Sequence, residues 1–267
     1  MTPNVLSIAG SDPSGGAGIQ ADIKAISANG GYAMAALTAL TVQNTQGVRA
    51  AQMLEPGFVA DQITAVFEDI RVDAVKIGML GTAEIVRAVA GALARRAAPV
   101  VLDPVMVAKG GDRLLAEAAV AALRAELLPK ATIVTPNLPE AADLLGEAEA
   151  GSREEMLAQA RQLLALGPRA VLLKGGHLGG EASPDLFATG DRVHWLEGPR
   201  IATRNTHGTG CTLSSAIATR LALGEEPLAA CVAAKAYVAR AIAGAGGLSV
   251  GQGHGPTDHF FMLRTQE

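Results

Sequence analysis

Short apolar segments of strand length alternate with longer segments of helical periodicity along almost the whole chain, and this alternation restricts the possible folds more than any other feature. Mostly apolar stretches occur at residues 5–9, 74–77, 100–102, 132–134 and 170–173. Strands of this kind, separated by amphipathic helices, are typical of a parallel sheet that is covered on both faces. The chain is therefore predicted to adopt an α/β fold.

The segments between these strands carry the helical periodicity and the remaining strands. Helices are predicted at residues 19–29, 57–70, 82–96 and 116–128, and two more after Cys211 and Pro227. Thr82 is the expected N-cap of the third helix. Residues 33–42 predict one buried strand, and residues 186–196 predict a two-stranded excursion. Because no Pro/Gly/Ser-rich linker or internal repeat divides the chain, a single domain over residues 1–267 is expected.

The composition argues against several classes of partner. The formal net charge is −4 without a run of like charges, and aromatic residues make up 3% of the chain. We therefore expect neither a nucleic-acid-binding surface nor contact with an anionic membrane. The apolar runs are expected to be too short or too interrupted to span a bilayer, and no signal peptide is expected at the start. Two cysteines without a C-x-x-C spacing indicate neither a disulfide framework nor a zinc site, so a cytoplasmic location is expected.

Polar residues and glycines follow the predicted strands at their carboxyl ends. In an open parallel sheet the ligand lies beyond these ends. The groups concerned are Gly10-Ser11-Asp12, Gln43-Asn44, Gly78-Met79, Asp103, Asn137, residues 174–177 and residues 205–212. The sequence therefore predicts that these groups share one edge of the sheet.

Residues 205–212 contain a glycine-rich turn directly before a helical pattern. Gly208 and Gly210 leave backbone N–H groups uncovered at the positive end of the helix dipole, which suits a phosphate. Cys211 falls in the first helical turn, where a thiol's pKa is expected to be lowered. The alternative is a small-residue turn before a core helix, with a buried cysteine. The local pattern favours neither interpretation.

The other candidate residues each have a structural alternative as well. Asp103 either forms a turn before Pro104 or faces Mg²⁺. Asn137 and Glu140 have the spacing of a capping box, but they could also meet a phosphate and a Mg²⁺-bound water. Lys174 either ends a strand in solvent or supplies a point charge for phosphate.

Further residues could hold a ring or cover the site. The Gln43 amide could read a heteroaromatic ring or merely bond the next loop, and Met79 could pack on a flat ring or fill a gap. His177 and His207 are expected in turns, without the spacing of a metal pair. Residues 109–111 form either a lid or a surface turn.

Two common nucleotide motifs are absent or weak. No G-x-x-x-x-G-K-[ST] occurs, so a P-loop is not expected. Residues 16–21 match a dinucleotide fingerprint only loosely, because the second strand ends at Gln43 and not at an acidic residue. An anion-binding turn, a lysine, two carboxylates and an amide at one sheet edge are instead the parts that phosphoryl transfer needs.

Several motifs in one order resemble the ribokinase superfamily, and within it the hydroxymethylpyrimidine/phosphomethylpyrimidine kinases of thiamine biosynthesis. The resemblance runs nearly end to end. It rests on residues 9–22 (AGSDPSGGAGIQAD), 41–45 (TVQNT), 76–80 (KIGML), 103–106 (DPVM), 135–140 (TPNLPE), 174–177 (KGGH) and 205–211 (NTHGTGC).

The resemblance implies a three-layer α/β/α sandwich with a mostly parallel sheet, ATP and Mg²⁺ as cofactors, and a homodimer. It implies transfer of the γ-phosphoryl group to the hydroxymethyl of 4-amino-5-hydroxymethyl-2-methylpyrimidine. A second transfer, to the monophosphate, would give the diphosphate.

The resemblance also assigns expected roles to residues. The expected substrate-binding residues are Gln43, which would bond the aminopyrimidine, with Val42, Met79, Asp22, Gly10 and Val105. The residues expected to form the catalytic anion hole are Gly208, Thr209, Gly210 and Cys211, together with Lys174. Those expected near ATP are Asn137, Lys174, Thr206 and His207, and those expected to face Mg²⁺ are Asp103 and Glu140.

Cys211 stands where the wider superfamily usually has an aspartate that acts as base. Our hypothesis is that Cys211 aligns the substrate hydroxyl and accepts its proton late, because a loose transition state needs little base assistance. The cysteine form also occurs in some pyridoxal kinases, so a pyridoxal/pyridoxine kinase is an alternative. A non-catalytic small-molecule binder on the same fold is a second. Lys109 and residues 176–184 are the lid candidates.

Overall fold

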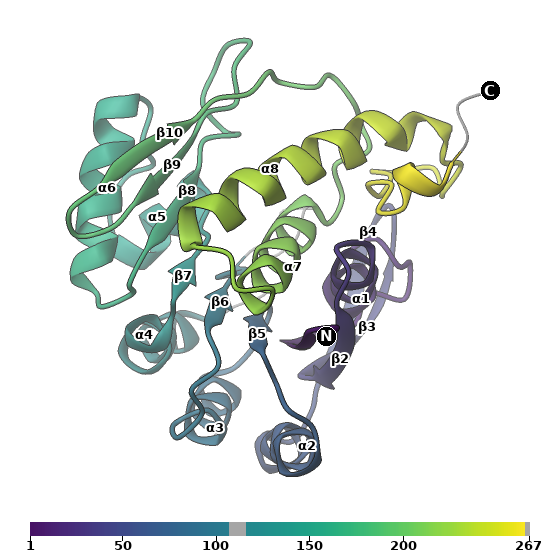
Figure 1. The fold of residues 1–267 in the computed structure, drawn as a ribbon, viewed down its shortest axis with the longest axis vertical. Coiled ribbons are helices and arrows are strands. Elements are labelled where there is room, and N and C mark those ends of the chain that lie inside the picture. Colours follow the sequence, from purple (N-terminus) through teal and green to yellow (C-terminus); the bar gives the residue numbers. More distant parts are fainter. Residues whose placement is uncertain (107–115, 265–267) are drawn as a thin grey trace.

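The computed structural model describes residues 1–106 and 116–264, and within them eight strands form one twisted sheet (Figure 1). The order is β10-β9-β8-β7-β6-β5-β1-β2. Strands β1 to β8 of this sheet run parallel, and β9 and β10 are antiparallel. The bounds are β1 Asn4–Ala9, β2 Tyr32–Leu37, β5 Ala74–Ile77, β6 Val100–Leu102, β7 Ile133–Val134, β8 Val171–Lys174, β9 Asp185–Ala188 and β10 Val193–Leu196.

Helices cover both faces of this sheet. One face packs against α1 (Gly18–Ala28), α7 (Thr209–Ala222) and α8 (Pro227–Gly244). The other packs against α2 (Pro56–Asp69), α3 (Ala83–Ala92), α4 (Glu117–Glu126), α5 (Leu138–Leu145) and α6 (Arg153–Ala165). Short 3₁₀ helices lie at Leu128–Lys130, Ala245–Gly247 and Phe261–Leu263. The predicted three-layer α/β/α sandwich is confirmed.

The predicted helices agree with the observed ones to within a few residues. Thr82 caps α3, since its side chain accepts a hydrogen bond from the Ile85 N–H at 3.3 Å. The predicted two-stranded excursion at residues 186–196 is the β9–β10 hairpin. Helix α6 was not predicted, because its apolar face is narrow and its mean hydropathy is low.

The single buried strand predicted at residues 33–42 is wrong. The chain leaves the main sheet at Thr38, whose N–H donates to Ala9 O and whose hydroxyl donates to Met79 O. Beyond it, β3 (Ala39–Asn44) pairs with β4 (Gly47–Met53) in a separate antiparallel ribbon. Leu40 and Val42 on this ribbon are 47% and 58% exposed. An apolar run does not reveal a strand that changes sheets, because both halves have the same composition.

Helix α8 corrects a second expectation. The segment Pro227–Gly247 is long and apolar enough to cross a membrane by length and composition. One face of α8 is buried in the core that it shares with α7, with Ala230, Cys231, Ala234, Val238 and Ala241. This burial accounts for its apolar character, so the segment is weak support for a membrane span.

The strand order reverses direction at β1. The chain passes from β1 to β2 on one side, and β5 pairs with β1 on the other. The carboxyl ends of β1 and β5 therefore flank a topological switch point, where α/β sheets bind ligands. Residues 10–17 follow β1 at this place and residues 78–82 follow β5.

Candidate active site

A large cavity of about 1650 Å³ lies beyond the carboxyl ends of the parallel strands. It brings together most of the candidate residues, which are separated by up to about 200 positions in the chain. The candidates that line it are Gly10, Gln43, Met79, Asp103, Val105, Asn137, Glu140, Lys174, Thr206, His207, Gly208, Thr209, Gly210 and Cys211.

Two candidates lie elsewhere among the described residues. Asp22 is fully buried inside α1, where it accepts hydrogen bonds from Ser7 Oγ at 2.6 Å and Ser215 Oγ at 2.8 Å. Val42 is on the exposed β3 ribbon. Neither lines the cavity.

The predicted anion-binding turn opens helix α7 into the cavity. Gly208 is the N-cap residue and adopts the left-handed conformation with φ 77°, which favours glycine. A Cβ at this position would also collide with the Gly16 carbonyl, so the turn is pressed against the loop after β1. The first turn of α7 carries no acidic side chain. Its N–H groups and the helix dipole are therefore available to an anion.

Cys211 lies where α7 meets the start of α1, and its sulfur accepts a hydrogen bond from the Gly18 backbone N–H. Burial nevertheless raises the pKa of the thiol to about 12. The nearby Lys76 charge lowers this pKa, but the carboxylates of Asp22 and Asp103 raise it again. The predicted lowering of the thiol pKa is therefore wrong, because desolvation outweighs the helix dipole. At neutral pH the side chain is a thiol.

Lys174 joins the two candidate carboxylates at the end of β8. Its Nζ lies 3.1 Å from Asp103 Oδ1 and 3.7 Å from Glu140 Oε2. Burial would lower the lysine pKa, but the charges of Asp103 and Glu140 raise it, so the ammonium stays charged. A Cβ on Gly210 would lie 3.4 Å from Nζ. The ammonium thus stands against the first turn of α7, beside the anion-binding N–H groups.

Glu140 forms the predicted capping box with Asn137. The Glu140 N–H donates to Asn137 Oδ1 at 2.8 Å, and the Asn137 N–H donates to Glu140 Oε2 at 2.7 Å. Burial raises the pKa of Glu140 to about 7, and the Asp103 charge adds to this effect, although Lys174 opposes it. The structural alternative for this pair is confirmed, and the same box holds the Glu140 carboxyl at the cavity wall.

The donor set at Asp103 and Glu140 fits Mg²⁺. No group of three or more possible protein ligands occurs among the described residues. Magnesium usually takes one or two carboxylates and completes its octahedron with phosphate oxygens and waters. Two carboxylates at the cavity wall match that requirement.

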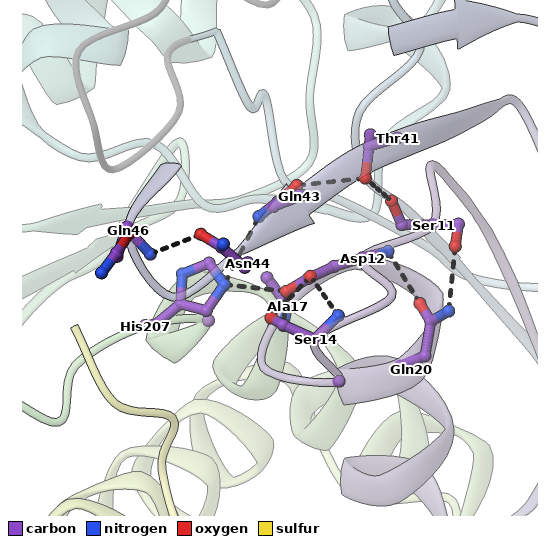
Figure 2. A network of polar contacts seen from close by, with 12 residues as sticks. Ser11, Asp12, Ser14, Ala17, Gln20, Thr41, Gln43, Asn44, Gln46 and His207 are labelled. Atoms are coloured by element: carbon purple, nitrogen blue, oxygen red, sulfur yellow. Dashed lines mark hydrogen bonds and ion pairs between the residues drawn. The ribbon is translucent and has the colours of Figure 1, made fainter. Parts of the chain in front are cut away.

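One part of the cavity is lined by the loops after β1 and β5 and by β3. Met79 is 9% exposed, and a Cβ on Gly10 would lie 2.5 Å from its terminal methyl. His207, expected beside the nucleotide, instead turns its ring toward Asp12 at 2.8 Å and Gln43 at 3.5 Å (Figure 2). The structure therefore groups His207 with the predicted ring-binding residue.

The lid candidate at residues 176–184 is held by hydrogen bonds from Arg200, and the candidate Lys109 lies outside the described residues. The Arg200 guanidinium donates to the carbonyls of Gly176 at 2.8 Å and Gly180 at 2.9 Å, and so fastens the loop of residues 176–184. Residues 109–111 are not among those that the structure describes.

Sequence reasoning missed a buried lysine next to the site. Lys76 lies in β5 and is 0% exposed, and its Nζ is 2.8 Å from Asp22 Oδ2. A charged residue inside an otherwise apolar strand is the signal that could have revealed it. Asp12, only 2% exposed, was likewise noted as part of a loop and given no role.

Comparison with known proteins agrees with the geometry. The phosphomethylpyrimidine kinase family matches residues 12–258. A hydroxymethylpyrimidine/phosphomethylpyrimidine kinase of Escherichia coli (strain K12) is 52% identical over 258 residues, which are 96% of this chain and 97% of that protein.

Solved structures show the same fold. Pyridoxal kinase from Staphylococcus aureus, in complex with AMP-PCP and pyridoxal, has a TM-score of 0.90 at 36% identity and covers 99% of this chain and 96% of its own. Phosphomethylpyrimidine kinase from Clostridium difficile 630 has a TM-score of 0.80 at 42% identity, covering 90% and 100%. The resemblance inferred from the motifs is thereby confirmed, and the chain belongs to the phosphomethylpyrimidine kinase family.

Proposed function

We propose that this protein transfers the γ-phosphoryl group of ATP to the hydroxymethyl oxygen of 4-amino-5-hydroxymethyl-2-methylpyrimidine, and then a second group to the monophosphate. The observation that carries this proposal is the position of Lys174, 3.1 Å from Asp103 and against the glycine turn of α7, in the same cavity as Gln43 and Met79. A charged anion site and a ring-sized site are thus adjacent.

In the proposed reaction the residues chiefly position charge. The N–H groups of Gly208 and Gly210 and the Lys174 ammonium hold the transferring group, whose charge they offset. Asp103 and Glu140 would hold Mg²⁺, which would neutralise phosphate charge when bound. The bond from the γ-phosphorus to the bridging oxygen breaks, and the bond to the substrate oxygen forms.

Cys211 aligns the substrate hydroxyl in this proposal. Because its thiol is protonated at neutral pH, it does not act as the base. The alcohol keeps its proton until the new P–O bond has largely formed, and then loses it to an oxygen of the transferred group. The variants Cys211→Ala, Cys211→Ser and Cys211→Asp test this role in kcat for the first phosphorylation. A loss of about 10⁴-fold in Cys211→Ala would restore the base hypothesis.

The adenosine part of ATP is proposed to lie along α8, where the cavity is lined by Leu228, Val232, Ala236 and Ala239. Asn137 and Thr206 line the same cavity. Pyridoxal kinase structures that superpose on this chain carry ADP or AMP-PCP in complex, which supports a nucleotide site.

The deciding experiment is product identification by mass spectrometry after incubation with ATP, Mg²⁺ and the pyrimidine alcohol. We expect the monophosphate first and the diphosphate afterwards. The close superposition with pyridoxal kinases makes phosphorylation of pyridoxal the second candidate. An equal or higher kcat/KM for pyridoxal than for the pyrimidine would reverse the order of the two.

We also propose a cytoplasmic homodimer in which the β3–β4 ribbon contributes to the interface. Leu40 and Val42 are exposed large apolar side chains on this ribbon. Apolar side chains grouped in this way indicate a contact surface. Sedimentation of the wild type and of Val42→Glu tests it, with a monomeric variant as the expected result.

A further inference from the structure

A hydrogen-bonded chain of side chains runs from the loop after β1 through His207 to Gln43 (Figure 2). Asp12 is its anchor and is 2% exposed. One of its oxygens accepts from Ser14 N–H at 2.9 Å and Ser14 Oγ at 2.7 Å. The other accepts from Ala17 N–H at 2.9 Å and lies 2.8 Å from His207 Nε2.

The partners of Asp12 determine which nitrogen of His207 carries a proton. The contacts of Asp12 with Ser14 and Ala17 are all with donors, which suits the ionised carboxylate. Burial acts to raise the Asp12 pKa, but the hydrogen bonds from His207 and Ser14 lower it overall. A carboxylate only accepts, so His207 Nε2 must be a donor.

This assignment conflicts with the amide orientation seen in Figure 2. There the Gln43 nitrogen faces His207 Nε2 at 3.5 Å, so that two donors would meet. The Gln43 oxygen faces Thr41 Oγ1 at 3.3 Å, but the Thr41 hydroxyl proton is already given to Ser11 O at 2.8 Å. The first contact would therefore join two donors, and the second would join two acceptors.

A half-turn of the carboxamide about its Cγ–Cδ bond resolves both mismatches. The Gln43 oxygen, in the position 3.5 Å from Nε2, then takes the longer branch of a bifurcated bond from the His207 Nε2–H, whose main acceptor is Asp12 at 2.8 Å, and the Gln43 amide donates to Thr41 Oγ1. Oxygen and nitrogen have nearly the same size, so the partners and not the shape decide between the orientations. One amide N–H and one oxygen lone pair are left for a ligand.

We propose that Asp12 and His207 are positioning residues that hold the Gln43 carboxamide in this one orientation, and so set the order of donor and acceptor that the site presents to a ring. The role of this orientation in recognising the substrate ring rests on the proposed function. An aminopyrimidine offers an acceptor nitrogen beside an exocyclic amino donor. The orientation of the amide decides which of its groups faces the ring acceptor and which faces the amino donor.

The first test reads the proton on His207 directly and does not depend on the substrate. Long-range ¹H–¹⁵N spectra of the full, ¹⁵N-labelled chain at pH 8 give the tautomer of each of the five histidines. The His207→Gln variant removes the signals of His207 and thereby assigns them. We expect a protonated Nε2. An unprotonated Nε2 would overturn the proposal, whatever the enzyme phosphorylates.

The second test separates positioning from packing. His207→Leu keeps the bulk but removes the donor, and should raise KM for the pyrimidine alcohol about tenfold, with KM for ATP within about twofold. His207→Gln retains an N–H of similar reach and should stay within about threefold of wild type. Equal losses in the two variants would contradict the proposal.

A double-mutant cycle shows whether His207 acts through Gln43. In a Gln43→Ala background, His207→Leu should change KM for the alcohol by less than about twofold. If the full loss persists there, His207 acts by another route. Asp61→Asn on the exposed face of α2 is the control, and we expect it to leave both KM values unchanged.

Discussion

Two lysine–aspartate pairs stand close to Cys211, and they differ in their access to the cavity. Lys76 and Asp22 are 2.8 Å apart with both side chains 0% exposed. Lys174 and Asp103 are 3.1 Å apart, and the lysine side chain is 15% exposed. Both lysines project from strands of the same sheet, but Lys76 lies within β5 and Lys174 is the last residue of β8. Position along the strand therefore separates a sealed ion pair from one that a ligand can reach.

The sealed pair joins elements that carry the site. Asp22 of α1 accepts from Ser7 of β1 and Ser215 of α7 as well as from Lys76 of β5. Both oxygens of the carboxylate thus accept hydrogen bonds from the protein. This network fixes the start of α7 relative to the switch point, which is where the anion-binding turn must be rigid.

The open pair is shared with a second carboxylate. Lys174 also lies 3.7 Å from Glu140, and Asp103 accepts from Thr135 at 3.2 Å. Two negative charges against one positive charge leave room for a cation, which the sealed pair does not. The comparison predicts that the first pair governs stability and the second governs catalysis.

The largest expected effect is on stability at the sealed pair. Lys76→Met leaves Asp22 buried without its counter-charge, and should lower the free energy of unfolding by about 3–5 kcal/mol. Urea denaturation followed by circular dichroism measures this. The double variant Lys76→Met/Asp22→Asn removes the uncompensated charge and should recover part of the loss. A double variant as unstable as the sum of the single ones would show that the pairing is unimportant.

The next effect is on catalysis at the open pair. Lys174→Met should lower kcat by about 10²–10³-fold, because a charge aimed at the transferring group is lost. We expect a smaller loss of stability than in Lys76→Met, since water from the cavity can solvate the carboxylates. Lys130→Met, at an exposed lysine, is the matched control. A Lys174→Met enzyme with normal kcat but reduced stability would contradict the division between the pairs.

A pH dependence of about tenfold per unit is expected from Glu140, the second carboxylate beside Lys174. Burial raises its pKa to about 7 from the usual 4.5, so the carboxyl is protonated below neutrality. Its ability to hold Mg²⁺ with ATP then falls, and kcat/KM for Mg·ATP should decrease as the pH drops through 7. Because the folded form binds this proton more tightly, folding stability should change in the opposite sense, declining as the pH rises from about 4.5 to 7.

Glu140→Gln is the control for this pH dependence. It keeps the shape of the capping box but cannot ionise, so both pH profiles should become flatter between pH 5 and 7. An unchanged profile would assign the titration to another group. The control also separates the carboxyl charge from its structural role at the start of α5.

The smallest effect is expected at Cys211, which lies between the two pairs. With a thiol pKa of about 12, alkylation by iodoacetamide should keep rising with pH beyond pH 10. Cys211→Ser should lower kcat by no more than about tenfold. An alkylation midpoint near neutrality would show that the lysine charges outweigh desolvation, contrary to the assignment made here.

Much of this site was predictable because it depends on local patterns. The glycine turn before α7 and the capping box of Asn137 and Glu140 are each set by residues within a few positions. The alternation of strands and helices then brings the carboxyl ends of the parallel strands to one edge of the sheet. The placement of Lys174 and Asp103 beside the turn follows from that topology.

Other properties were not predictable, because they depend on contacts between distant residues. Asp12 and His207 are 195 positions apart, and Asp22 and Ser215 are 193 apart. A motif shows that such residues belong to a family, but not which side chain faces the ligand and which is sealed in the core. Asp22 and Val42 illustrate this, since both lie in recognisable motifs and neither lines the cavity.

The sequence by itself determined the layered α/β architecture, the family, and a glycine turn at the start of α7, because periodicity and backbone freedom are local properties. Only the tertiary structure decided the direction of the Cys211 pKa, the burial of the Lys76–Asp22 pair and the partners of Gln43. These depend on how much water is excluded and on which charges are brought within a few ångströms, and both are consequences of packing.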